Sequence, residues 1–166
     1  MGSYTVIADT GRSIIELLRA KMTPEPMQKQ EMIGLCEPGD RGSYILGIHL
    51  FNIEENGELR QVNPINLGGD ERRNPPLTLS LSYMISVMSK SDISSRAIDE
   101  QRILGKAAQV LYDYRRIPEE YLVGTIKDYN ENIEINLMNL LLEEKVRIWS
   151  LFNEPYRLSM FYKVGP

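Results

Sequence analysis

Hydrophobic side chains recur along this chain at two different spacings, and each spacing predicts one kind of secondary structure. Between residues 5 and 22 the spacing is three or four positions, which is typical of one face of a helix. The set is Ile7, Gly11, Ile14, Leu18 and Met22. We expect Pro24 and Pro26 to end this helix, because proline has no backbone N–H to donate. A glycine within the stripe predicts that another backbone approaches closely at Gly11.

Two later stretches have the same helical spacing. A wide apolar stripe predicts a helix from about residue 95 to residue 114, with Ser94 or Ser95 as its N-terminal cap. The third predicted helix covers about residues 141–152. Its apolar stripe is Leu142, Val146 and Trp149, a pattern that is typical of a core-facing side. Residues 119–130 have neither spacing and are expected to be irregular.

Five other stretches predict β-strands: residues 32–36, 44–54, 77–88, 133–137 and 157–164. The strand at 44–54 differs from the others because both of its faces are apolar. One face carries Leu46, Ile48 and Leu50, and the other carries Ile45, Phe51 and Ile53. Such a strand lies either at the centre of a sheet under helices or beneath another subunit.

Two of these strands supply candidate interface residues. In the strand at 77–88, apolar side chains alternate with small hydroxyls such as Ser80 and Ser82, which suit a solvent or interface surface. In the last strand, Ser159 alternates with an apolar set that we expect in the core: Leu158, Met160, Tyr162 and Val164. If this strand lies at a sheet edge, its backbone can accept an extended arm from a neighbouring subunit, with Ser159 and Tyr162 as contact residues.

A long segment without periodicity separates the strands at 44–54 and 77–88. Residues 55–75 are rich in Asn, Gly and Pro, and a loop of this length in a compact domain is usually functional or disordered. It contains the charge cluster Asp70, Glu71, Arg72 and Arg73. We expect this cluster to order against a neighbouring subunit.

The order of the predicted elements indicates the fold class. Strands joined both by hairpins and by helical crossovers predict an α+β fold, with a mixed, mostly antiparallel sheet packed by about three helices. The 166 residues, 42% of them hydrophobic, suffice for one ordinary core and predict a single domain over residues 1–166.

Charge and composition exclude several classes of function. A net charge of -4 argues against a nucleic-acid partner, because binding phosphates needs an excess of Lys and Arg. No apolar run approaches the roughly 18 residues of a membrane span, so we expect no direct membrane insertion. The N-terminus lacks the pattern of a signal peptide, which predicts synthesis and assembly in the cytoplasm.

The chain has few residues that could carry catalysis. His49 is its only histidine and Cys36 its only cysteine, so the sequence predicts no metal site and no internal disulfide. The glycine-containing turns are not followed by a phosphate-binding motif, so no cofactor is predicted. A small enzyme that uses Cys36 is the remote alternative, and it would need His49 and an orienting group beside the thiol.

Several segments together resemble one protein family. They are Asn74–Met84 with its Pro-Pro-Leu strand start, Arg102–Tyr112, Ile133–Trp149 and Ile148–Val164, preceded by the helix around Ile14–Leu18. In this order, and over nearly the whole chain, they resemble the cap or tail terminator proteins of phage-tail-like contractile injection systems. Members often carry Ser or Thr as a helix cap where this chain has Leu141, and residues 22–43 match no motif of the family.

The resemblance implies a structural protein rather than an enzyme. It implies a homohexamer ring that closes the distal end of the particle, on the last ring of the inner tube protein and the last ring of the sheath protein. The alternative is a neck or tail-completion protein of a contractile-tailed phage, which would share the fold and differ in its neighbouring genes.

Overall fold

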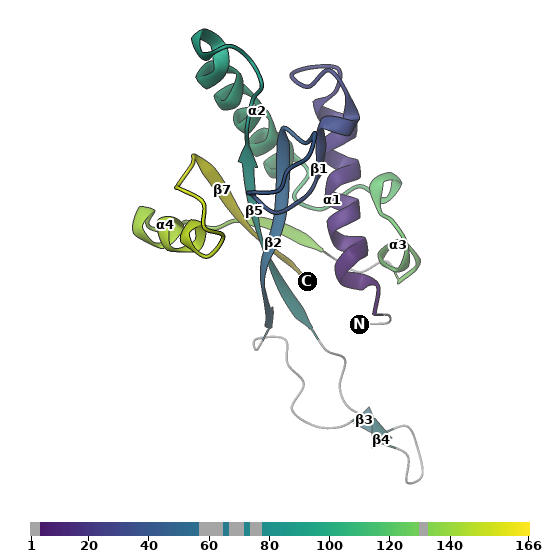
Figure 1. Ribbon diagram of the computed structural model, residues 1–166. Helices are drawn as coiled ribbons and strands as arrows, with labels where there is room; N and C mark the ends of the chain where they lie inside the picture. Colours follow the sequence, from purple (N-terminus) through teal and green to yellow (C-terminus); the bar gives the residue numbers. More distant parts are fainter. Residues whose placement is uncertain (1–3, 57–64, 67–71, 74–77, 130–132) are drawn as a thin grey trace.

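The computed structural model describes residues 4–56, 65–66, 72–73, 78–129 and 133–166. The first helix, α1 (Val6–Met22), is followed by a 3₁₀ turn at Gln30–Met32 and by two strands, β1 (Ile33–Leu35) and β2 (Leu46–Glu55). Further along lie the short strands β3 (Ile65–Asn66) and β4 (Arg72–Arg73), then β5 (Leu79–Val87) and α2 (Ile93–Asp113). A 3₁₀ turn at Glu119–Tyr121, α3 (Thr125–Tyr129), β6 (Glu134–Leu137), α4 (Leu142–Ser150) and β7 (Ser159–Gly165) complete the order (Figure 1).

One five-stranded sheet organises these elements, in the order β1-β2-β5-β7-β6. β1 and β2 run parallel, and every other neighbouring pair in this sheet is antiparallel. The prediction of an α+β fold with a mixed, mostly antiparallel sheet is therefore confirmed. β5 lies at the centre, between β2 and β7, and Tyr83 of β5 stands opposite Tyr162 of β7.

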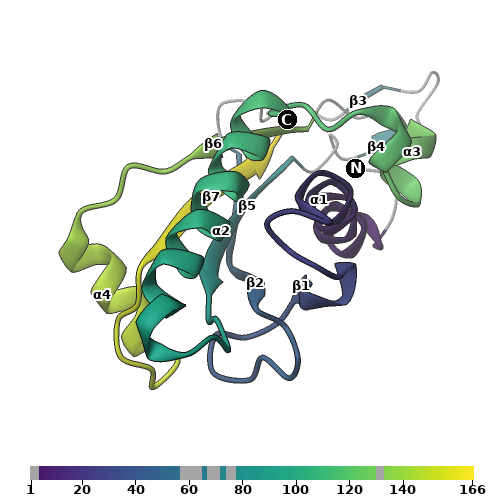
Figure 2. The same ribbon diagram turned by 90° about the horizontal axis from the view of Figure 1, so that it is seen from above.

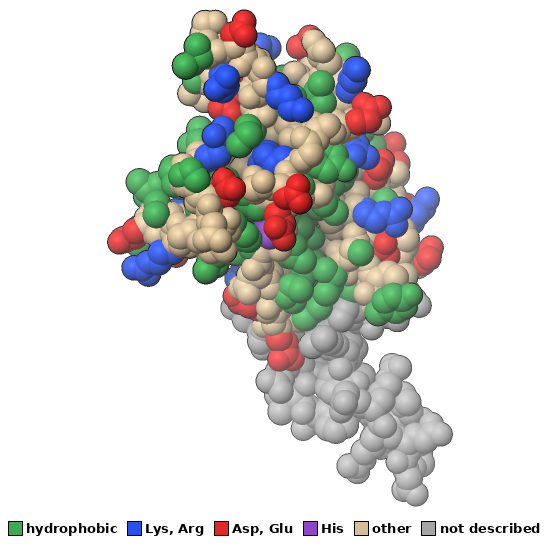
Figure 3. Space-filling model, viewed as in Figure 1, with side chains coloured by type: hydrophobic (Ala, Val, Ile, Leu, Met, Phe, Trp, Pro, Cys, Tyr) green, Lys and Arg blue, Asp and Glu red, His purple; other side chains and the backbone are tan. Residues whose placement is uncertain are grey.

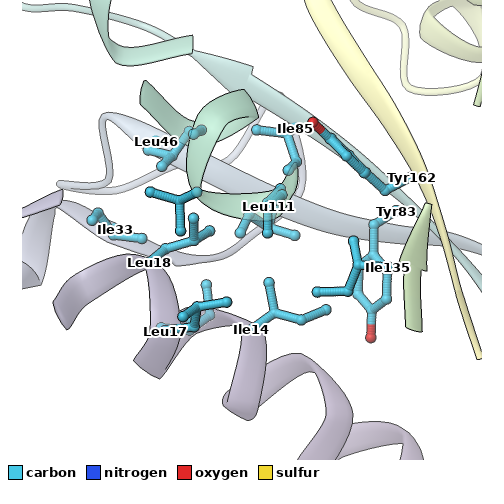
Figure 4. Packing of buried hydrophobic residues seen from close by; sticks show 14 of the residues in the cluster. Ile14, Leu17, Leu18, Ile33, Leu46, Tyr83, Ile85, Leu111, Ile135 and Tyr162 are labelled. Atoms are coloured by element: carbon cyan, nitrogen blue, oxygen red, sulfur yellow. The ribbon is translucent and has the colours of Figure 1, made fainter. Parts of the chain in front are cut away.

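The main hydrophobic core lies between the sheet and the helices α1 and α2. Leu17 and Leu18 of α1 are fully buried there, together with Leu111 of α2 (Figure 4). Tyr83 and Ile85 of β5 supply the floor of this core, because alternate residues of a strand point to the same face. The predicted spacing of the first helix is thus confirmed, and it reflects burial against this sheet face.

A smaller core lies on the opposite face of the sheet, beneath α4. It contains Met84 of β5, Phe161 of β7 and Trp149 of α4, all fully buried. Seen from above, α4 and α1 stand on opposite sides of the molecule (Figure 2). Both faces of the sheet therefore pack against helices, and among the described residues the helix on the second face is the short α4.

The irregular region and the helix cap differ from the sequence prediction. Residues 119–129, predicted to be irregular, include the 3₁₀ turn and α3. Ile126 of α3 is buried in the main core, although no periodic pattern surrounds it in the sequence. The second helix begins at Ile93 with Asp92 as N-cap residue, and neither Ser94 nor Ser95 caps it. The described part of the chain thus contains four α-helices where about three were predicted.

Two predicted contacts along α1 and β2 also differ. A backbone was predicted to approach Gly11, but the group that lies close to it is the side chain of Leu35. A Cβ atom at Gly11 would lie 3.2 Å from Leu35 Cδ1. In β2 the register with β5 shifts between Leu50 and Asn52. This bulge takes Phe51 to the smaller core while Ile53 stands opposite Leu81, so Phe51 and Ile53 do not share a face as predicted.

Candidate assembly surfaces

The last strand lies inside the sheet, so the edge position that strand addition at β7 requires is not present. β5 pairs with it on one side from Leu81 to Ser86, and β6 pairs with it on the other. Beyond β6, the backbone N–H of Met138 donates to the carbonyl of Phe161 at 2.8 Å. The backbone groups that an incoming arm would need there are already used within the chain.

Ser159 has a structural role in the smaller core. Its side chain is buried, its Oγ accepts a hydrogen bond from Trp149 Nε1 at 2.9 Å, and it donates to the carbonyl of Arg157 at 3.0 Å. The bond from Trp149 connects α4 to the start of β7, and the bond to Arg157 fixes the Ser159 hydroxyl locally. The Ser159 side chain is therefore not available for the predicted contact with a partner, because its own chain covers it.

The other residues of the predicted core face of β7 behave differently from one another. Tyr162 and Val164 are buried as predicted, and Met160 is half-buried. Burial raises the pKa of Tyr162 to about 12, and its hydroxyl faces Met160 Sδ. Leu158 is 57% exposed, so its predicted core position is wrong; it precedes the first residue of β7 and lies outside the sheet.

The hydroxyl face of β5 is mostly covered. Ser82 and Ser86 are buried, while Ser80 near the start of the strand is half-exposed. Ser82 is flanked by Asn52 of β2 and Lys163 of β7, because β5 is the central strand. The expectation of a solvent or interface surface therefore fails at Ser82 and stays a prediction at Ser80.

The charge cluster of the long loop is only partly within the described residues. Asp70 and Glu71 lie outside them. Arg72 and Arg73 form β4, whose backbone pairs with β3 in a two-stranded antiparallel sheet. Their role at an interface stays a prediction.

Cys36 and His49 both line a surface groove between α1 and β2. The pKa shifts of the two side chains do not favour catalysis. Burial raises the pKa of the Cys36 thiol, although nearby Arg41 lowers it in part, so the reactive thiolate is disfavoured. Burial also lowers the pKa of His49, whose ring packs edge-on against Phe152. Among the residues that the structure describes, no group of His, Cys, Asp or Glu could hold a metal ion.

The helix α4 exposes most of the apolar stripe that its sequence contains. Trp149 is buried, but Leu142 is 63% and Val146 44% exposed. The side that packs on the sheet is instead Lys145, Ile148, Trp149 and Phe152. The prediction that the whole stripe faces the core is wrong, because the helix is rotated so that Leu142 and Val146 form an exposed ridge.

A partly apolar groove lies between α1 and the strands β1 and β2. It has a volume of about 350 Å³ and is lined by Ile7, Ala8, Gly11, Leu35 and Leu50, with Tyr83 at its floor. The Tyr83 hydroxyl lies beside Gly11 and has no hydrogen-bond partner among the described residues. Figure 3 shows apolar side chains both over α4 and over the region between β2 and α1. Periodicity alone did not reveal either surface.

Comparison with protein-family models gives a match over residues 9–166, to the family described as the Pvc16 N-terminal domain. This match spans nearly the whole chain. The chain belongs to this family.

Solved structures support the family fold. The chain matches the sheath/tube terminator of an extracellular contractile injection system, PVC, in its extended state, with a TM-score of 0.63 and 18% identity. It also matches the tube-terminating cap of the anti-feeding prophage, with a TM-score of 0.62 and 15% identity. These matches cover 99% and 95% of this chain, respectively.

The matched structures are considerably longer than this family member. The alignments cover 56% of the sheath/tube terminator and 53% of the tube-terminating cap. No curated protein matches the sequence. Within the described residues, none of the helices is both long and apolar enough to cross a membrane.

Proposed function

We propose that this chain forms the terminator ring of a contractile phage-tail-like particle. Six copies close the distal end, where the last ring of the inner tube and the last ring of the sheath meet. Assembly takes place in the cytoplasm, and the protein then stays in the particle as a structural component without catalytic activity.

The observation that carries this proposal is the agreement of fold over nearly the whole chain with two proteins described as a sheath/tube terminator and a tube-terminating cap. A second observation supports an assembly role. Two separate apolar surfaces, the α4 ridge and the groove beside α1, are open on a single copy. Contiguous exposed apolar patches on a protein surface often mark sites of contact with other proteins.

Particles produced with and without this protein test the proposal. We expect particles that lack it to have sheaths and tubes of variable length with open distal ends, visible by electron microscopy. Adding the purified protein back should restore uniform, closed ends. Particles of normal length with closed ends in its absence would contradict the proposed function.

We further propose that the Asp70–Arg73 cluster contacts a neighbouring copy or the last tube ring. Opposite charges across an interface favour correct pairing and fast association. Reversing both arginines, Arg72→Glu with Arg73→Glu, should reduce the fraction of closed ends while the circular dichroism spectrum stays unchanged. A double variant that closes particles as well as the parent would remove this cluster from the interface.

A further inference from the structure

The α4 ridge is an amphipathic surface that its own chain does not cover. Leu142 and Val146 are one helical turn apart and both are exposed, while the neighbouring Trp149 anchors the helix on the sheet. Both side chains lie outside the side of α4 that packs on the sheet, so they are available to pack against a second surface. Leu141, the N-cap residue of α4, is also exposed.

The groove beside α1 has the complementary chemistry. Its walls are apolar side chains from two elements, Ile7 of α1 and Leu50 of β2, and at its mouth Leu35 is 42% exposed. Ala8 is exposed on the α1 rim, so a side chain from outside meets only a methyl group there. Glu37 and His49 also line this groove. The branched apolar residues of the ridge can enter its apolar part, between α1 and Leu50.

Charges on the two rims are also complementary. On α4, Glu143 and Arg147 are exposed beside the ridge. At the groove, Glu37 lines the mouth, whereas the exposed Arg12, one turn after Ala8, already pairs with Asp9 of its own helix at 3.4 Å. Arg147 beside the ridge can therefore pair with Glu37 at the groove when the surfaces meet, with the specificity that opposite charges give to an interface.

We propose that the α4 ridge of one copy of this chain docks into the α1–β2 groove of the next copy. The two surfaces are different patches of the molecule, and apolar side chains of both are visible in one view (Figure 3), so the contact is head-to-tail and each copy offers one ridge and one groove. Head-to-tail contacts of this type build rings when the rotation closes. The inference rests on the proposed ring function and assigns the surfaces that join its subunits.

Complementation between two variants tests the contact. Leu142→Glu with Val146→Glu removes the ridge but keeps the groove, and Ala8→Trp fills the groove but keeps the ridge. The dissociation constant of each variant alone should be at least about 100-fold higher than that of the parent. In both variants the apolar groups of the contact stay in water, so their burial energy is lost. An equal mixture of the two should form heterodimers, because one copy still offers a groove and the other a ridge.

A matched control uses the two exposed isoleucines of α2, Ile93→Glu with Ile98→Glu, which lie outside both surfaces. This control should self-associate like the parent in light scattering and mass photometry. The inference is overturned if the parent itself stays monomeric, if the control loses association as strongly as the ridge variant, or if the mixture stays monomeric. Circular dichroism and the fluorescence of Trp149 show that each variant is folded.

End closure of particles separates this inference from the proposed function. A ridge variant that fails to form rings and fails to close ends supports both. A ridge variant that closes ends normally overturns the ridge contact while the terminator function stands. A parent protein that never closes ends overturns the function itself.

Discussion

The hydrogen bond between Trp149 and Ser159 should hold α4 on the sheet, and removing it should have a measurable cost. Ser159→Ala deletes the acceptor of a fully buried indole N–H. An unsatisfied buried donor costs about 1–3 kcal/mol, so we expect this loss in the free energy of unfolding. For a domain of this length, that corresponds to a fall in Tm of about 2–4 °C for each kcal/mol.

The assay can use the protein's own fluorescence, because Trp149 is the only tryptophan. Urea unfolding followed by Trp149 emission reports α4, and circular dichroism reports the whole fold. A cycle with Trp149→Phe and the double variant isolates the bond, with an expected interaction energy of about 1 kcal/mol. If Ser159→Ala is as stable as the parent, or if the two substitutions are additive, the bond contributes nothing and our reasoning about α4 is wrong.

Two further predictions concern burial and pH. Leu158→Ala should change the free energy of unfolding by no more than about 0.5 kcal/mol, because the side chain is mostly exposed. Leu17→Ala in the core should cost about 2–5 kcal/mol. Equal losses in urea unfolding would contradict the placement of Leu158. Burial alone would raise the pKa of Asp9, but hydrogen bonds from the backbone and hydroxyl of Thr125 lower it overall. Its contribution to stability is therefore present above the unfolded-state pKa of about 3.9 and is lost as the pH falls through the lower pKa of the folded state. In Asp9→Asn, the Tm should consequently fall less steeply than in the parent as the pH is lowered through this range.

The sequence determined the elements whose signals are local. The spacing of Ile14, Leu18 and Met22 requires a helix that buries one side, and α1 follows this pattern to within one residue of the predicted start. Alternation in the strand at 77–88 likewise predicted which residues of β5 face the main core, including Tyr83 and Ile85. The family resemblance, carried by ordered segments rather than by single residues, was also present in the sequence, and the family match over residues 9–166 confirms it.

Tertiary structure alone decided which polar and apolar groups remain accessible. Ser159 reads as an exposed residue in an alternating strand, yet Trp149 from another element covers and binds it. Leu142 reads as a core residue of a helical stripe, yet the rotation of α4 about its Trp149 anchor leaves it in solvent. The physical reason is that periodicity fixes which side chains share a face, whereas burial depends on what packs against that face, and that partner is an element distant in the sequence or another copy of the chain.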